Sequence, residues 1–116
     1  MEATILYIER KRSDSPNFVP ALRKKGFQVE SVSSGSEAVA RLNDMQPNLV
    51  IINAASLRTN GRRICRSLRN AMTHLPILVI LDKDQNTQND DCATINIRLP
   101  FTARKLVSLT QIRVPQ

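Results

Sequence analysis

Short apolar runs that alternate with helical patterns constrain the fold of this chain more than any other feature. Residues 49–52 (LVII) and 77–81 (ILVIL) are apolar throughout, whereas the segments between such runs carry apolar residues at helical spacing. A strand without polar positions is buried on both faces of its sheet, which is typical of parallel sheets covered by helices. The pattern therefore predicts an α/β domain with a parallel sheet.

Local signals place the other elements. Strands are expected at 4–8, 27–32, 49–52, 77–81 and 94–99, and helices after Ser15, after Ser34, over 61–72 and after Thr102. Ser34 and Glu37 have the spacing of a capping box, and a glycine at position 26 ends the first helix. Pro20 would remove a backbone hydrogen bond from a helix capped by Ser15, so that helix is expected to be kinked or to begin later.

The stretch between the last two expected strands breaks the alternation. Residues 82–93 (DKDQNTQNDDCA) contain almost no apolar residue, so they cannot form a helix that buries one face. We expect a loop, or at most one exposed helical turn, where a fourth helix would stand. The 116 residues, 41% of them hydrophobic, suffice for one domain, expected at 1–112, with 113–116 as a tail or the start of a linker.

Positive charge is concentrated in one region. The chain has 17 basic and 10 acidic residues, a net charge of +7, and no acidic residue lies between Asp44 and Asp82. Three arginines in the helix expected at 61–72 follow i, i+4, i+7 spacing and share one face. This arginine stripe is a candidate surface for phosphates or an acidic protein, or else an ordinary solvated helix face. The candidate residues are Arg58, Arg62, Arg63, Arg66 and Arg69.

The two cysteines give no metal or redox motif. Cys65 and Cys92 form no CxxC pair and have only His74 as a companion, so we expect two free thiols, with Cys92 the more reactive. No apolar run is long enough to span a membrane, and the N-terminus does not fit a signal peptide. These features favour a cytoplasmic protein without a membrane partner.

The order and spacing of several motifs resemble a receiver domain of two-component response regulators. The clearest stretch is GFQVESVSSGSEAVARLNDMQPNLVII, residues 26–52, in which receivers carry Gly-aromatic-x-Val, Gly-x-Glu-Ala and Pro-Asp-Leu-Val-Ile. Gly61 matches the glycine of the next loop, and Pro100-Phe101 matches the Pro-Phe after the final strand. The resemblance covers nearly the whole chain. It implies the flavodoxin-like doubly wound fold, a five-stranded parallel sheet in the order 2-1-3-4-5.

The resemblance also implies a phosphorylation site, and the chain departs from it at every position. Receivers use an Asp that accepts the phosphoryl group, an acidic pair that holds Mg²⁺, and a Ser or Thr and a Lys that bind the phosphoryl oxygens. An amide nitrogen is not nucleophilic, so no acyl phosphate can form here. The chain is therefore expected to be a pseudo-receiver without catalytic residues, metal or cofactor. The corresponding residues are Glu9 and Arg10 for the acidic pair, Asn53 for the phosphoacceptor, Leu81 for the Ser or Thr and Leu99 for the Lys.

Two of these positions allow alternatives. Asn53 could be deamidated to Asp, or it could simply cap the end of its strand. Glu9 could bind a cation, alone or together with Asp82, or it could be an ordinary solvated residue.

Three functions follow, in order of preference. The first is a non-enzymatic, receiver-like signalling module that acts by phosphorylation-independent contact with an output or sensor domain, or by dimerisation. Its expected contact surfaces are the face around the last strand and helix and the arginine stripe. The second is a basic nucleic-acid-binding module that uses Arg58–Arg69, although the chain lacks interleaved aromatic residues. The third is a receiver phosphorylated on an unorthodox residue.

Overall fold

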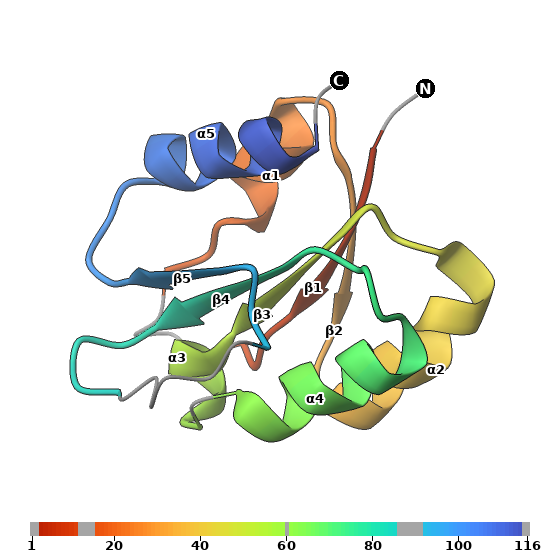
Figure 1. The fold of residues 1–116 in the computed structure, drawn as a ribbon. Coiled ribbons are helices and arrows are strands. Elements are labelled where there is room, and N and C mark those ends of the chain that lie inside the picture. Colours follow the sequence, from red (N-terminus) through yellow and green to blue (C-terminus); the bar gives the residue numbers. More distant parts are fainter. Residues whose placement is uncertain (1–2, 12–15, 60, 86–91, 115–116) are drawn as a thin grey trace.

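A single five-stranded parallel sheet forms the centre of the domain in the computed structural model, which describes residues 3–11, 16–59, 61–85 and 92–114. The strand order is β2-β1-β3-β4-β5 (Figure 1), so the expected fold class and strand order are confirmed. The elements are β1 (Thr4–Ile8), α1 (Val19–Lys24), β2 (Gln28–Val32), α2 (Gly35–Met45), β3 (Leu49–Asn53), α3 (Ala54–Leu57), α4 (Arg62–Ala71), β4 (Ile77–Leu81), β5 (Ile95–Arg98) and α5 (Ala103–Arg113).

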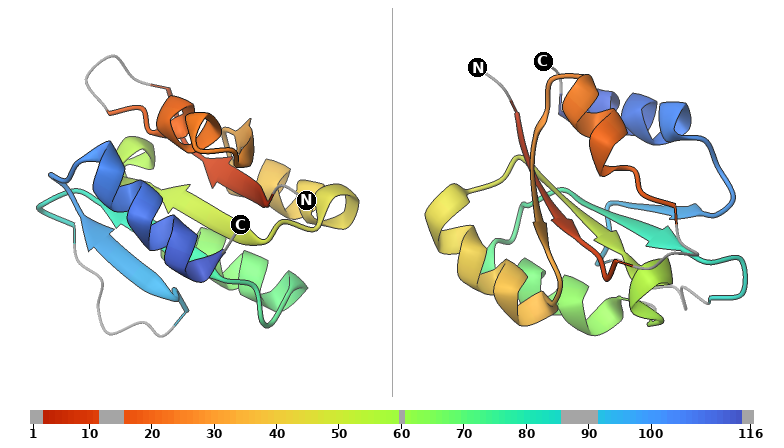
Figure 2. Two further views of the ribbon diagram at one scale, coloured as in Figure 1. Left: turned by 90° about the horizontal axis from the view of Figure 1, so that it is seen from above. Right: turned by 180° about the vertical axis from the view of Figure 1, so that it is seen from behind.

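Helices cover the sheet on both faces. Helices α1 and α5 lie on one face, and α2 and α4 lie on the other (Figures 1 and 2). Side chains alternate between the two layers, as the pleat requires: Ile5 and Tyr7 belong to the core under α1 and α5, and Leu6 and Ile8 to the core under α2 and α4. All residues of β3 and β4 are buried, which explains their apolar runs.

Helix α1 resolves the difficulty posed by Pro20. The helix begins at Val19, so Pro20 falls in its first turn, where backbone N–H groups have no partner within the helix. The Asn17 side chain accepts a hydrogen bond from the Val19 N–H at 3.2 Å. The late start is confirmed, whereas the expected cap, Ser15, lies outside the described residues.

Two local signals act as expected. The Ser34 hydroxyl accepts a hydrogen bond from the Glu37 N–H at 3.1 Å and caps α2, although the Glu37 carboxylate pairs with the Ser33 hydroxyl instead of returning to the cap. Gly61 has a φ of +77°, and a Cβ there would lie 3.3 Å from the Ile52 side chain. A turn that packs this closely onto β3 requires glycine.

The segment between β4 and β5 carries no helix in its described parts, residues 82–85 and 92–94. The rest of the expected loop, residues 86–91, lies outside the described residues. One element was missed, because the single turn of α3 directly after β3 is too short to show a period. Helix α5 buries Leu106, Val107 and Thr110, while Ile112 is 70% exposed. The helix runs through Arg113, and Val114 is buried behind it.

No helix in the described part of the chain is long and apolar enough to cross a membrane.

Candidate functional site

Asn53 is the last residue of β3, so it lies at the carboxyl edge of the sheet, and it is 1% exposed. Its side-chain oxygen accepts a hydrogen bond from the Ser56 N–H at 3.2 Å, which makes Asn53 the N-cap of α3. The Ser56 hydroxyl in turn donates to the Asn53 backbone carbonyl at 2.8 Å. Asn53, the residue predicted to correspond to the phosphoacceptor, therefore has a structural role as a helix cap.

The β1 strand contributes the residues that face Asn53. The Asn53 side-chain Nδ2 donates to the Tyr7 hydroxyl at 3.4 Å, a long hydrogen bond between two buried groups. Burial raises the pKa of the Tyr7 phenol, with a smaller contribution from the charge of Glu9, so this hydroxyl stays neutral. The Arg10 N–H donates to the Ser56 hydroxyl at 3.1 Å, which ties the end of β1 to α3.

Glu9 is buried, with 7% of its surface exposed, so its interpretation as a solvated residue was wrong. Its backbone N–H extends the pairing with β2 by donating to the Val32 carbonyl at 3.0 Å, which draws the residue into the domain. Desolvation raises the pKa of the Glu9 carboxyl, and the nearby charge of Lys11 lowers it only in part. One carboxyl that is reluctant to ionise is a poor ligand for a divalent cation.

Gln85 closes the space beside Asn53 from the β4 side. Its side-chain nitrogen donates to the backbone carbonyls of Ala54, at 3.2 Å, and Thr59, at 2.8 Å. Its oxygen accepts a hydrogen bond from the Asp82 N–H at 2.8 Å. The Asp82 carboxylate is exposed and accepts from the Lys83 N–H. This edge of the sheet is therefore joined by neutral hydrogen bonds.

Leu81 and Leu99, the residues predicted to correspond to the phosphoryl-binding positions of receivers, pack in the two cores. Leu81 is 1% exposed and belongs to the core under α2 and α4. Leu99 packs against the opposite core and precedes a cis peptide bond to Pro100. Beside Leu99, Arg98 is directed to the same edge and donates to the carbonyls of Asp82 and Lys83, at 2.9 and 3.3 Å, and of Gln85. The Arg98 guanidinium therefore binds the backbone here.

The predicted arginine stripe is only partly a surface. Arg62, Arg63 and Arg66 lie along α4 beside an open depression of about 690 Å³, which Thr59, Ser67 and Asn70 also line. Arg58 is exposed in the preceding loop with a φ of +56°. Arg69, the expected fifth member, instead turns toward the backbone, so its assignment to the stripe was wrong. We use the name "arginine surface" for Arg58, Arg62, Arg63 and Arg66.

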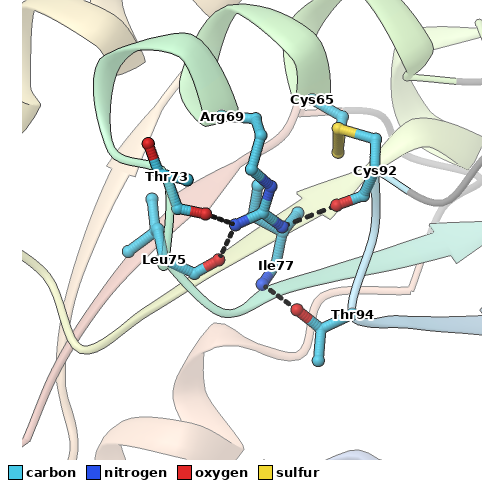
Figure 3. Close-up of a disulfide and its surroundings, with 7 residues drawn as sticks. All are labelled: Cys65, Arg69, Thr73, Leu75, Ile77, Cys92 and Thr94. Atoms are coloured by element: carbon cyan, nitrogen blue, oxygen red, sulfur yellow. Dashed lines mark hydrogen bonds between the residues drawn. A yellow bond between two sulfur atoms is a disulfide. The ribbon is translucent and has the colours of Figure 1, made fainter.

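Arg69 holds three backbone carbonyls together at the carboxyl end of α4 (Figure 3). Its Nη1 donates to the carbonyls of Thr73, at 2.9 Å, and Leu75, and its Nη2 donates to the carbonyl of Cys92 at 2.6 Å. An arginine can do this because its planar guanidinium presents several N–H groups in fixed directions. This role follows from the loop conformation, which helical periodicity cannot predict.

Cys65 and Cys92 form a disulfide beside Arg69 (Figure 3), with their Cα atoms 6.2 Å apart. The expectation of two free thiols, with Cys92 reactive, was therefore wrong. It failed because the 27-residue separation between the cysteines gave no sign that the fold brings them together. His74 is exposed in the loop after α4, as expected.

Comparisons with known proteins agree with the fold. The response regulator MprA of Mycobacterium sp. (strain KMS) is 27% identical over 112 residues, which cover 93% of this chain and 49% of that protein. MprA of Mycobacterium tuberculosis (strain ATCC 25177 / H37Ra) is 26% identical over the same length. The chain thus spans about half the length of the curated relatives it matches. No protein-family model matches it.

Solved structures show the same fold. The chemotaxis response regulator CheY4 of Vibrio cholerae superposes with a TM-score of 0.79 at 19% identity and covers 98% of this chain and all of its own. NtrX from Brucella abortus, in complex with ADP, gives a TM-score of 0.81 at 19% identity over 98% of this chain and 26% of its own.

A five-stranded doubly wound domain with its polar residues at the carboxyl edge of β1 and β3 has the architecture of a receiver. Together with the sequence relatives, this architecture makes the chain similar to the receiver domain of response regulators. The predicted resemblance is confirmed. Receiver domains are generally non-enzymatic, and response regulators interact with proteins such as kinases or output domains.

The residues present do not fit the Mg²⁺ that the family implies. Arg10 stands in place of one carboxylate, the pKa of Glu9 is raised by burial, and the side-chain oxygen of Asn53 is committed to the cap of α3. Among the described residues no group of three or more His, Cys, Asp or Glu side chains could hold a metal ion. We therefore assign no step to a metal here.

Sequence reasoning found Glu9, Arg10, Asn53 and Leu81 at this edge but missed the groups that join them. Tyr7 carried a signal, because a lone tyrosine in an apolar strand needs a partner for its hydroxyl. Ser56, Gln85 and Arg98 carried none, since their roles depend on loop conformations.

Proposed function

We propose that this domain signals through phosphorylation-independent contact with a protein partner, as a pseudo-receiver. The observation that carries the proposal is the engagement of Asn53, whose amide caps α3 and contacts Tyr7 instead of facing an open reaction site. An amide nitrogen shares its lone pair with the adjacent carbonyl, so it cannot attack a phosphoryl group as a carboxylate does. Leu81 and Leu99 offer no donor to a phosphoryl oxygen.

Treatment of the purified domain with acetyl phosphate and Mg²⁺, followed by intact-mass analysis, tests this proposal. We expect no covalent phosphoryl group on the protein. A receiver with an intact phosphorylation site, treated in parallel, shows that the donor is active. A phosphoryl adduct that maps to residues at the carboxyl edge of the sheet would overturn the proposal.

The arginine surface is the proposed contact for an acidic region of the partner. No acidic residue lies between positions 44 and 82, so Arg58, Arg62, Arg63 and Arg66 give this part of the sequence a positive charge. The depression beside them has room for side chains of a partner, and arginine binds carboxylates through two parallel hydrogen bonds. A cytoplasmic location, as is typical of response regulators, belongs to the same proposal.

The alternative function, nucleic-acid binding, rests on the net charge of +7. Titration with a DNA duplex of arbitrary sequence and, separately, with a polyglutamate peptide distinguishes the two. We expect chemical-shift changes on α4 with the peptide and no salt-dependent affinity for the duplex. Substitution of Arg62, Arg63 and Arg66 by Gln should abolish the changes, whereas Lys24→Gln with Lys25→Gln on α1 should leave them. Salt-dependent duplex binding lost in the arginine variant would favour the alternative.

A further inference from the structure

The Cys65–Cys92 disulfide connects two elements at the point where the domain departs from regular strand–helix alternation. Cys65 lies within α4 and is 2% exposed, whereas Cys92 is half-buried and stands shortly before β5. Strand β5 is at the edge of the sheet and pairs only with β4 (Figure 1). The bond therefore attaches the segment that leads into the edge strand to the helix that carries the arginine surface.

The same segment is also attached by contacts that do not involve sulfur (Figure 3). The Cys92 carbonyl accepts from Arg69 at 2.6 Å. Thr94 is paired with Ile77, since its N–H donates to the Ile77 carbonyl at 2.8 Å and its hydroxyl accepts from the Ile77 N–H at 3.0 Å. Opening the disulfide would remove one of several attachments and leave β5 in register, so the fold does not depend on this bond alone.

We propose that Cys65–Cys92 is a redox-reversible site, opened in the folded protein by a dithiol reductant, which loosens the segment before β5 from α4. The reversibility of the bond rests on the cytoplasmic location that belongs to the proposed function, because a disulfide in a reducing cytoplasm is typically transient and redox-sensing. The position of the bond and its noncovalent supports are independent of that function.

The exchange begins at Cys92, the more accessible of the two residues. A thiolate of the reductant attacks the Cys92 sulfur, a mixed disulfide forms, and the Cys65 sulfur leaves as a thiolate that takes a proton. The second thiolate of the reductant then attacks the reductant's own sulfur in the mixed disulfide. Cys92 leaves as a thiolate and takes a proton. Two electrons pass from the dithiol, which leaves as a disulfide, to the two cysteines.

Loss of the bond acts on the edge of the sheet and on the helix beside it. Arg98 of β5 holds the start of the β4–β5 segment through the carbonyls of Asp82 and Lys83, while Arg69 and the disulfide hold its end. After reduction the hydrogen bond from Arg69 to the Cys92 carbonyl still joins that end to α4. The change therefore falls on the segment before β5 and on α4, the helix that carries Arg62, Arg63 and Arg66, and the Asn53 region keeps its contacts.

Incubation of the native domain in defined dithiothreitol buffers tests the chemistry, because reduction then takes place without denaturant. After an acid quench the protein is unfolded and labelled with maleimide, so that the buried Cys65 is also reached. We expect the two thiols to become reactive together, and oxidised glutathione to restore the bond. Amide exchange measured on both forms tests the structural effect. The Thr94 N–H should exchange about tenfold faster after reduction, because opening of its segment becomes easier. The Gln28 N–H, bonded to the Ala3 carbonyl at 2.9 Å across the sheet, should be accelerated less than the Thr94 N–H, because its segment is not attached by the disulfide.

A variant with Cys65→Ala and Cys92→Ser should show the fast Thr94 exchange in oxidising and reducing buffers alike. If that variant does not fold, Cys92→Ser alone serves the same comparison and leaves the buried position unchanged. Two free thiols in oxidised protein, reduction only after unfolding, or equal acceleration at Gln28 and Thr94 would each overturn the proposal. The phosphoryl-transfer test is separate, so failure here is distinguishable from failure of the proposed function.

Discussion

The region around Asn53 and the region around Arg69 use polar groups in opposite ways. Around Asn53, a buried amide, a phenol and a hydroxyl form neutral hydrogen bonds. Around Arg69, a cation binds backbone carbonyls beside a covalent bond that redox conditions can open. The group that we propose to undergo a chemical change, the Cys65–Cys92 disulfide, therefore lies beside α4 and β5 and not at the end of β3.

The largest effect should come from opening the disulfide. A bond that closes a loop of this length, between residues 27 apart, restricts the unfolded chain, so reduction should lower the free energy of unfolding by about 3–4 kcal/mol. Urea denaturation of oxidised and reduced protein measures the difference. A double variant lacking both cysteines should match the reduced protein, and no change on reduction would contradict the assignment.

The next largest effect should be the loss of stability when Arg69 is replaced, compared with an arginine of the arginine surface. Arg69→Gln removes charge-assisted hydrogen bonds to the carbonyls of Thr73, Leu75 and Cys92, and should cost about 2 kcal/mol of stability. Arg63→Gln, on the same helix and exposed, should change stability by less than about 0.5 kcal/mol. Equal costs in urea denaturation would show that Arg69 is an ordinary surface residue.

Two asparagines with the same kind of backbone contact test whether burial makes the Asn53 amide important for stability. Both Asn53 and Asn48 accept a backbone N–H through the side-chain oxygen, from Ser56 and Thr4 respectively, but Asn53 is buried and Asn48 is exposed. Asn53→Asp should therefore cost about 1–3 kcal/mol at pH 7, because it buries a charge and removes the donor to Tyr7. Asn48→Asp should stay within about 0.5 kcal/mol. Thermal unfolding of both variants measures the contrast.

The smallest effect concerns Glu9 and depends on pH. Burial raises the pKa of this carboxyl in the folded protein, so the folded state binds its proton more tightly than the unfolded chain does. The stabilisation of the folded state by this proton is complete below the ordinary pKa of Glu, about 4.3. It is lost as pH rises through the raised pKa of the folded protein. Glu9→Gln should therefore stabilise the domain at pH 7 and have little effect at pH 3.5. The exposed Asp84→Asn is the control, and a gain at low pH only would contradict the sign.

Prediction from sequence worked where burial alone decides the structure. The runs at 49–52 and 77–81 had to form central strands, and Gly61 and Ser34 marked turns whose backbone chemistry is local. The interpretation of Asn53, Leu81 and Leu99 as departures from the receiver pattern came from the resemblance to receivers and stays a prediction. The side of α5 that is buried was less clear, since apolar and polar residues are mixed along it.

The connections between distant loops could not be predicted. Arg69 belonged to a periodic stripe in sequence, and only the path of residues 73–75 and 92 brings carbonyls to its guanidinium. The disulfide depends on the same path. Gln85 likewise joins two loops that no local pattern relates.

The most direct test of the central claim is an amide NMR spectrum of the isotope-labelled domain with and without Mg²⁺ and beryllofluoride, which mimics an aspartyl phosphate. We expect no change in the amide chemical shifts of Glu9, Asn53 or Asp82, and none in β5 or α5. Shifts at these residues that extend into β5 and α5 would contradict it, because the domain would then still switch in response to a phosphoryl group.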